Sequence, residues 1–593
     1  MSEGQKLIKI FKKPQLIFIA VATVCRVLLS QWIGNWYASE QTFDDYILVA
    51  YANLTEHFRT PNINSLVKDM GYPLFLDFTH LTGLSYNIVL SIVWVVAAVL
   101  MVRLFSRFTS QRGFLIFVYL FVLFTPCAFD YYAGTRLYRN SIIAPFLFIV
   151  FSLMLILIAD VLKNNQITAK KILLNVIALS FFFTFTYYIK EDGFWMLPCL
   201  LLMFVLCIGI SVYHYFKSKD KQKLAQTVRL VAALCLPLVL FFAGTHFYKG
   251  INYHFFGVYE INTRTEGELG KFVSNIYKIK SENRDKNYWA PYDAIEKAFD
   301  ASETLQEFPE LEESILNTVW FNNSETSSMI AGDFLTWVMR TSLDTTGIWQ
   351  SDQQINELFA QVNQEISRAF SEGTLEKDDR ISLTSAGGSR SFEEILELQD
   401  EMVQTYKTAI LLDGYEALST KTSYSRMESC QNASYITNMN FLPIENGYIN
   451  GFQAKKQTVG NEIASVVFKI YSVLNPILCG IAVISFFATL IMFFIRKKER
   501  KKEKKSLVAF AALAVFVFVG MSLVYAFGIS WFSEFIWRET NVVSVRVLKL
   551  YTIGIVPMLC MVELFGLYLF SGHVKNLFSV LASRKKALHF SKS

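Results

Sequence analysis

The sequence predicts an all-α polytopic membrane protein that carries a mainly helical extracytoplasmic domain. Hydrophobic residues make up 53% of the 593 residues, charged residues make up only 18%, and the apolar residues gather in long runs. Ordinary soluble domains have about 25% charged residues. The net charge of +6 is small, and the lysines cluster between apolar runs. This pattern orients a chain in a bilayer, so we expect no nucleic-acid partner.

Ten apolar runs reach the length of about 20 residues that a transmembrane helix needs. We therefore expect ten transmembrane helices, at residues 14–34, 86–106, 113–131, 141–161, 172–189, 195–214, 229–247, 472–495, 506–528 and 549–571. The first run is long and lacks a small-residue cleavage site, so it is expected to be a membrane anchor rather than a cleaved signal.

Basic residues between the runs predict the orientation of the chain. Four lysines precede the first run, which places the N-terminus in the cytoplasm. Strict alternation then puts the other basic loops and the C-terminal tail on the same side, so we expect a multi-pass protein of the cell membrane with both termini cytoplasmic. The outer segments are then 35–85, 130–140, 190–194, 248–463 and 529–548.

Three regions follow from this topology. Residues 1–247 form an N-terminal module of seven helices that includes the first outer loop, residues 35–85, and residues 464–593 form a C-terminal module of three. Residues 248–463, between helices seven and eight, are long enough for a domain. Apolar residues recur at helical spacing from Ile355 to Phe370, and Ser391 begins a capping-box pattern, so this domain is expected to be helical.

Acidic and basic side chains converge on the outer face, where helices end. The first outer loop holds Asp44, Asp45 and Lys68, and the other outer loops add Asp130, Arg136, Arg139, Glu191, Asp192 and Arg546. A carboxylate there can act as a general base towards a hydroxyl, and arginine or lysine can hold a phosphate. A substrate that is a lipid phosphate carrying a sugar would need both.

The first outer loop resembles that of the GT-C superfamily of membrane glycosyltransferases. The likeness lies in the Asp44-Asp45 pair and in Lys68-x-x-Gly71-Tyr72-Pro73 just before the second apolar run. The nearest branches are protein O-mannosyltransferases and aminoarabinose transferases. The long outer segment also resembles that of uncharacterised bacterial membrane proteins, in Asn252…Phe256-Gly257-Val258 and in Trp337-Val-Met-Arg340…Gly347. A weaker likeness is the stretched pattern Arg546…Tyr551…Pro557 near the last run.

The resemblance implies an inverting glycosyltransferase. It would move a sugar from a polyprenyl-phosphate donor in the membrane lipid to an extracytoplasmic acceptor, a cell-envelope polymer or a protein. Asp44 would be the general base or a metal-bound carboxylate, with Asp45 supporting it. The donor phosphate would contact Lys68, Arg136, Arg139 and Arg546. A second acidic or metal site would use Asp130, Glu191 and Asp192, which leaves a divalent metal ion open as a cofactor.

Other interpretations stay open at this point. Asp44 and Asp45 can cap a helix that starts at Tyr46, and Lys68 can be a lysine that extends to the membrane surface. A transporter or flippase for a lipid-linked envelope precursor, or a scaffold without activity, also fits the topology. Arg26 and Glu563 fall inside apolar runs, where unpaired charges are unfavourable, which suggests that they pair with each other.

Overall fold

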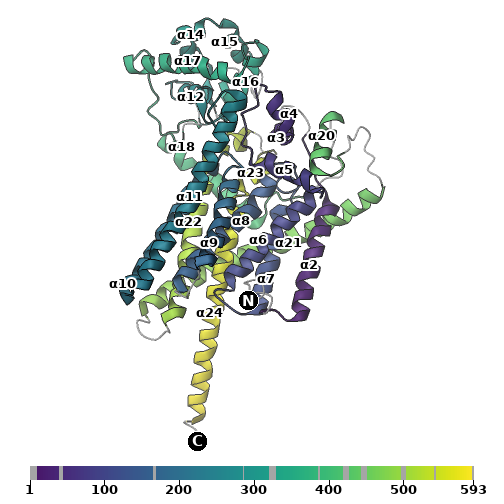
Figure 1. Cartoon of the computed structure of the whole chain (residues 1–593), viewed down its shortest axis with the longest axis vertical. Coiled ribbons are helices and arrows are strands. Elements are labelled where there is room, and N and C mark those ends of the chain that lie inside the picture. Colours follow the sequence, from purple (N-terminus) through teal and green to yellow (C-terminus); the bar gives the residue numbers. More distant parts are fainter. Residues whose placement is uncertain are drawn as a thin grey trace.

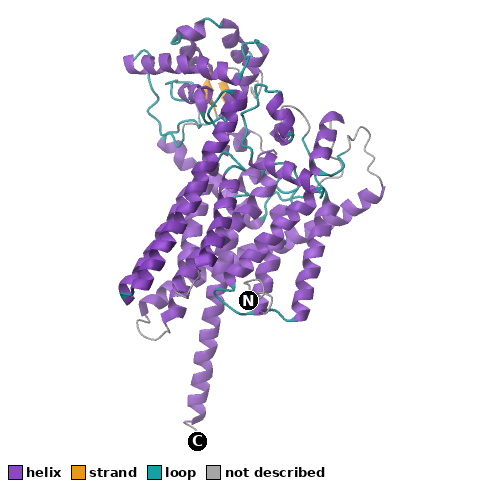
Figure 2. Ribbon diagram, viewed as in Figure 1, coloured by secondary structure: helices purple, strands orange, loops and turns teal. Residues whose placement is uncertain are grey.

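The computed structural model of the chain is a bundle of long helices with a helical domain at one end (Figure 1). The structure describes residues 10–38, 44–163, 169–284, 286, 288–318, 329–384, 387–417, 427–441, 451–495, 502–539 and 543–590. Regular structure in these residues is helical apart from two short strands (Figure 2). The all-α class is therefore confirmed, and the arrangement is that of a multi-pass membrane protein.

Nine helices of the described residues are long and apolar enough to cross a membrane. They are α2 (Lys13–Ile33), α6 (Tyr86–Phe105), α8 (Asn140–Lys163), α9 (Ala169–Tyr187), α10 (Met196–Ser218), α11 (Lys221–Phe256), α21 (Gly451–Ile495), α22 (Lys502–Glu539) and α24 (Ile555–Phe590). Helix α8 is the central helix, since every residue from Asn140 to Val161 is buried. It packs against α6, α9 and α10, while α24 packs against α21 and α22.

The structure differs from the transmembrane helix that was predicted at residues 113–131. Helix α7 (Arg112–Leu123) has 12 residues, and at roughly 1.5 Å per residue it is about 18 Å long, too short for the ~30 Å apolar layer. A 3₁₀ turn, η1 (Pro126–Ala128), follows it, because proline lacks the N–H that would continue the helix. The chain still passes along the bundle. Arg112 bonds to the carbonyl of Ile10 near one end, and Asp130 pairs with Lys549 at the other.

The basic loops lie together at the end of the bundle opposite the domain. Arg107 and Lys171 both pair with Asp160 there, at 2.8 and 3.1 Å. The turn between α10 and α11, which is rich in lysine, lies at the same end (Figure 1). The grouping follows from the alternation of the spans. That this basic end faces the cytoplasm and the domain faces outward stays a prediction.

The structure does not join Arg26 to Glu563. The guanidinium of Arg26 donates to the carbonyl of Leu123 at 3.0 Å and lies 4.4 Å from the ring centre of Phe129. Glu563 accepts a hydrogen bond from the thiol of Cys479 at 3.4 Å. No ion pair between the two is present in the described residues, so the prediction that they pair is wrong. Each side chain instead contacts neutral groups of neighbouring helices. Such contacts, like an ion pair, stabilise a polar group inside a bundle.

The domain has a hydrophobic core separate from that of the bundle. Its elements are α12 (Gly267–Ile276), β1 (Tyr288–Pro291), α13 (Tyr292–Asp300), α14 (Glu303–Gln306), α15 (Pro309–Leu316), β2 (Met329–Ala331), η3 (Gly332–Phe334), α16 (Leu335–Thr345) and α17 (Asp352–Glu372). The two strands pair antiparallel. Ile355, Phe359, Val362 and Ile366 form the buried face of α17, which confirms the helix expected from their spacing.

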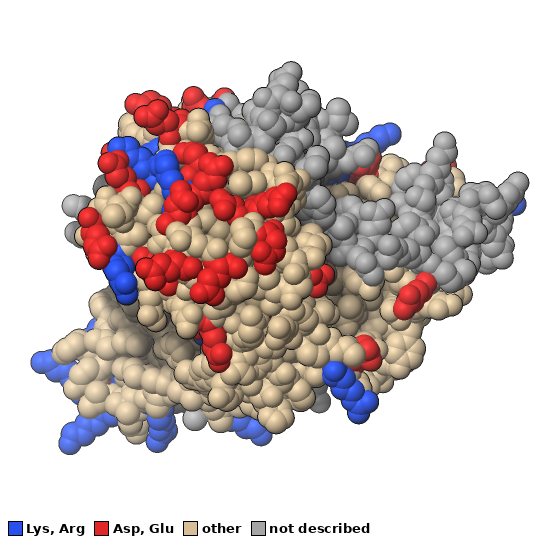
Figure 3. Space-filling view, turned by 90° about the horizontal axis from the view of Figure 1, so that it is seen from above, with Lys and Arg blue, Asp and Glu red and all other residues tan. Residues whose placement is uncertain are grey.

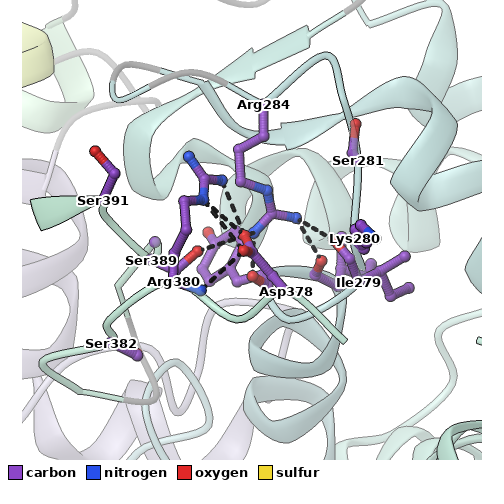
Figure 4. A network of polar contacts seen from close by, with 12 residues as sticks. Ile279, Lys280, Ser281, Arg284, Asp378, Arg380, Ser382, Ser389 and Ser391 are labelled. Atoms are coloured by element: carbon purple, nitrogen blue, oxygen red, sulfur yellow. Dashed lines mark hydrogen bonds and ion pairs between the residues drawn. The ribbon is translucent and has the colours of Figure 1, made fainter. Parts of the chain in front are cut away.

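A polar network around Asp378 holds the loop that follows α17 (Figure 4). Asp378 accepts from Arg380 Nε at 2.9 Å and from Ser389 Oγ at 2.7 Å, and Arg284 Nη1 lies 3.7 Å away. Arg284 also donates to backbone carbonyls at the end of α12. The network ties the loop to the core, and it ends where α18 (Phe392–Glu397) begins with the capping box predicted at Ser391.

Short elements cover the domain end of the bundle. They are α3 (Asp44–Ala52), α4 (Leu54–Arg59), α5 (Gly71–Thr82), η2 (Gly193–Trp195), α19 (Gln399–Tyr406), the π-helical turn η4 (Lys407–Leu411), α20 (Met427–Thr437) and α23 (Val543–Thr552). Helix α20 packs against α3 and α5, and α19 packs against α22, so part of the segment 248–463 lies on the bundle. Helices α11 and α21 continue without a break through its predicted borders, 248 and 463.

The domain carries many exposed carboxylates. On α13 to α15 and beside them these are Glu296, Asp300, Glu303, Glu307, Glu310 and Glu313. Acidic side chains outnumber basic ones over the domain surface seen in Figure 3. This surface therefore repels polyanions, and an anionic ligand would be favoured only where the domain meets the bundle and cations gather.

Candidate active site

Asp44 lies in the first turn of α3, where the bundle and the domain meet. Its Oδ2 is 2.7 Å from Lys68 Nζ, accepts from the hydroxyl of Tyr138 at 2.8 Å, and is 3.8 Å from Arg139 Nη2. The side chain is still 26% exposed. Desolvation raises the pKa of Asp44, but the charges of Lys68, Arg139 and Arg264 outweigh it and hold the pKa below its usual range. Asp44 is thus an ionised carboxylate that is partly open to solvent.

Lys68 comes from the turn before α5, and its side chain is fully buried. Burial lowers the pKa of Lys68 to about 8, although Asp44 favours the charged form. The Nζ atom lies 5.1 Å from the ring centre of Trp337, and an indole face attracts cations. The first outer loop therefore brings together the carboxylate and the lysine that the sequence predicted, in direct contact.

Asp45 has a different setting from its neighbour Asp44. It is fully buried and pairs in a bidentate way with Arg136, at 2.6 and 2.9 Å. The guanidinium carbon of Arg136 also lies 5.2 Å from the ring centre of Trp36 and 4.9 Å from that of Tyr132. The backbones of Trp36 and Arg136 also form a parallel bridge. Asp45 and Arg136 thus join the first two outer loops, and both groups face protein on all sides.

Arg139 connects Asp44 to a second carboxylate. Its Nη1 donates to both carboxylate oxygens of Glu191, which is only 10% exposed. Desolvation raises the pKa of Glu191, but Arg139 and Lys68 outweigh it and lower the pKa overall. The next residue, Asp192, is 44% exposed and pairs with Lys190 at 3.0 Å. Glu191 therefore belongs to the cluster around Asp44, while Asp192 pairs within its own loop.

Asp130 anchors helix α23 instead. Its Oδ1 lies 3.0 Å from Lys549 Nζ and accepts from the backbone N–H of Glu416, and its Oδ2 accepts from the N–H groups of Tyr132 and Ala133. Asp130 and Lys549 are both fully buried. Every acceptor position of Asp130 is used in holding three segments together. Sequence reasoning missed Lys549, because nothing in the sequence marks its partner.

The three carboxylates predicted as a second acidic or metal site are not gathered. Asp130, Glu191 and Asp192 pair with three different cations. Among the described residues, no group of three or more His, Cys, Asp or Glu side chains is placed to hold a metal ion. These three carboxylates thus do not form a metal centre.

Helix α23 carries two residues of the Arg…Tyr…Pro pattern. Arg546 lies on this helix, but its side chain is outside the described residues. Tyr551, also on α23, is half-buried. Burial raises the pKa of Tyr551, Asp44 raises it further, and Arg139 lowers it. The larger charge effects on this pKa come from Asp333, which raises it, and Arg264, which lowers it.

Asp69 is a site residue to which the sequence assigned no role. It is buried next to Lys68 and accepts a hydrogen bond from the side-chain amide of Asn262 at 2.9 Å. Burial and the nearby charge of Glu191 raise the pKa of Asp69 well above its usual range. The surroundings thus shift the pKa values of these two carboxyl groups in opposite directions, that of Asp69 upwards and that of Glu191 downwards.

The domain contributes a further group that the sequence did not indicate. Arg264, in the loop before α12, pairs with Asp333 of η3, and both are part-exposed. The ring centre of Trp337, on α16, lies 5.9 Å from the guanidinium carbon of Arg264 and 5.1 Å from Lys68 Nζ. No motif includes Arg264 or Asp333, and both lie far from Lys68 in the sequence, so only the fold brings them to the site.

Comparisons with known proteins found no relative of this chain. No family model, no curated protein and no solved structure matches the chain.

Proposed function

We propose that the protein is a membrane glycosyltransferase of the GT-C kind. It would move a sugar from a polyprenyl-phosphate donor to a hydroxyl of an extracytoplasmic acceptor, a cell-envelope polymer or protein, with inversion. The observation that carries the proposal is the setting of Asp44, a part-exposed carboxylate in direct contact with Lys68 and near Arg139. Transfer of the sugar needs a base for the acceptor hydroxyl and cations for the departing phosphate, close enough together to act on one bound substrate.

In this reaction the acceptor oxygen attacks the anomeric carbon of the donor sugar. The bond from that carbon to the phosphate oxygen breaks, and the polyprenyl phosphate leaves with the electron pair. Asp44 takes the proton of the acceptor hydroxyl, while Lys68 and Arg139 stabilise the charge that develops on the phosphate. Attack from the face opposite the leaving group inverts the anomeric centre.

The low pKa of Asp44 fits this mechanism only with donor bound. A carboxylate whose pKa is strongly depressed is a weak base. Lys68 and Arg139 cause much of that depression. A donor phosphate that draws both cations away from Asp44 would raise its pKa towards a useful range. The base would thus be activated by the presence of the substrate.

An apolar groove between α8, α10 and α22 supports a lipid-borne donor. Its lining is apolar or sulfur-bearing, with Phe151 and Met154 on α8, Met203 on α10 and Phe518 on α22. A polyprenyl chain needs such a surface, since it has no polar group to bond along its length. The chain would lie against the bundle while the phosphate reaches Lys68.

The test combines lipid analysis with one substitution. Mass spectrometry of the purified protein is expected to find a polyprenyl phosphate. Asp44→Asn is expected to lower sugar transfer from the polyprenyl-phosphate donor by about a hundredfold to ten-thousandfold, the usual contribution of a general base. Asp344→Asn, an exposed aspartate of α16, serves as the control and should transfer at the wild-type rate.

Two results would reject the proposal. One is an Asp44→Asn protein that inserts normally and transfers sugar at full rate. The other is wild-type protein in vesicles that moves a labelled polyprenyl phosphate across the bilayer without any transfer of sugar. That second outcome would establish the flippase instead.

A further inference from the structure

The loop that carries Arg264 is bonded to the segment that carries Lys68. The N–H of Thr263 donates to the carbonyl of Leu66 at 2.7 Å, and the amide of Asn262 donates to Asp69 at 2.9 Å. The residues that flank the two cations thus join a domain loop to the first outer loop. Arg264 and Lys68 are consequently held beside one another and cannot drift apart independently.

A buried arginine of the domain strengthens this connection. Arg340 of α16 is 2% exposed and donates to the carbonyl of Ile63 at 2.5 Å and to Thr263 Oγ1 at 2.6 Å. It therefore contacts both the Lys68 segment and the Arg264 loop. Trp337 lies one turn before Arg340 on the same helix, and its ring lies near both cations. The pair of cations and the indole between them form one pre-arranged unit.

The two cations differ in how open they are. The side chain of Lys68 is fully buried, whereas that of Arg264 is 20% exposed and that of its partner Asp333 is 30% exposed. Among the described residues, Asp333 has no ion-pair partner other than Arg264. An anion entering from solvent would meet Arg264 before Lys68, and Asp333 can turn into solvent when it is displaced.

We infer that Arg264 is a further phosphate-binding cation beside Lys68 and Arg139, supplied by the domain and paired with Asp333 until the phosphate of the ligand replaces that carboxylate. The inference rests on the proposed function for the identity of the ligand, a polyprenyl monophosphate. Arg264 is suited to the role because its fork of N–H donors matches phosphate oxygens in pairs. Asp333 is then a competitor, so the two residues have opposite effects on binding.

The test measures binding of a polyprenyl monophosphate to the full-length protein in nanodiscs, with inorganic phosphate as a second, soluble probe. Arg264→Ala is expected to weaken binding of the lipid phosphate by about tenfold to a hundredfold, the value of a charged hydrogen bond. Asp333→Asn is expected to bind at least as tightly as wild type, because it removes the competing carboxylate. Arg368→Ala, an exposed arginine of α17, is the matched control and should bind like wild type.

The outcomes separate the inference from the function beneath it. If wild type binds the lipid phosphate and the affinity of Arg264→Ala is within about twofold of the wild-type affinity, the role inferred for Arg264 is wrong. The proposed polyprenyl-phosphate donor is then unaffected. If Asp333→Asn loses as much affinity as Arg264→Ala, the ion pair is structural and the inference is wrong. If wild type binds neither probe, the donor is wrong, and the role of Arg264 with it. Equal competition by inorganic phosphate would show that the headgroup alone is recognised.

Discussion

Two adjacent aspartates of this chain have separate tasks. Asp44 is part-exposed and surrounded by cations that a phosphate can engage, whereas Asp45 is buried in a closed pair with Arg136. Successive residues of a helix point about 100° apart, which allows neighbours to face different surroundings. Removing one partner of a buried pair leaves the other charge without compensation. At the scale of single residues, the part-exposed carboxylate is thus the chemical candidate and the buried one is a structural link.

We expect Lys68 to make the proposed affinity for a phosphate depend on pH. In the free protein its pKa is about 8, so it carries its charge below that pH and loses it above. A phosphate monoester is already fully ionised above about pH 7, so Lys68 should dominate the alkaline change. We expect the affinity for polyprenyl monophosphate to fall as pH rises through about 8, by up to about tenfold per unit.

Titration of binding by native mass spectrometry or calorimetry checks this. Lys68→Arg keeps its charge throughout the range and should show no such fall, since arginine does not deprotonate in proteins. A wild-type affinity that stays level across the alkaline range would contradict the assignment of Lys68 to the phosphate.

At the scale of elements, the site depends on close contacts between backbones. Gly71 begins α5, and its N–H donates to the carbonyl of Tyr188 at the end of α9, at 2.9 Å. A Cβ at this position would collide with the backbone of Tyr188, which cannot move aside as a side chain can. Glycine is therefore required where α5 meets α9. The contact keeps the Lys68 turn beside the loop that holds Glu191.

Gly71→Ala is expected to lower the melting temperature of the detergent-solubilised protein and to reduce binding of polyprenyl monophosphate. The physical reason is that the backbone must shift, and the shift moves Lys68 away from Asp44. Gly113→Ala on α7 is the control, since open space surrounds that position, and alanine in a helix is favoured over glycine by about 1 kcal/mol. A Gly71→Ala protein with unchanged melting and binding would show that the two helices can separate without harm.

At the scale of the whole molecule, charge separates the two ends. Exposed carboxylates cover the domain (Figure 3), while the basic loops gather at the opposite end of the bundle. Positively charged loops stay in the cytoplasm during insertion, so the domain and the site should face outward. The site then lies where a polyprenyl-linked donor and an envelope acceptor both have access.

Labelling of single cysteines in intact cells tests this orientation. Arg368→Cys in the domain is expected to react with a membrane-impermeant maleimide in intact cells, because α17 would be outside. Lys217→Cys, at the end of α10, should react only after the cells are opened. The reverse pattern would invert the topology and remove the proposed acceptor from reach.

The long helices were determined by the sequence alone. A bilayer core of about 30 Å requires about 20 apolar residues whatever the fold, so nine of the ten predicted runs overlap long helices in the part of the chain that the structure describes. The exception contains Pro126, which ends the helix early. The sequence also placed Asp44 and Lys68 in one loop, and the structure brings them to 2.7 Å.

Only the tertiary structure decided how the other charges pair. Asp45 with Arg136, Asp130 with Lys549 and Arg264 with Asp333 join segments that are far apart in the chain. Such pairs have no periodicity and no fixed spacing, because they depend on which surfaces meet when the helices and the domain pack. The same packing separated Asp44 from Asp45 and brought the domain's Arg264 to the site.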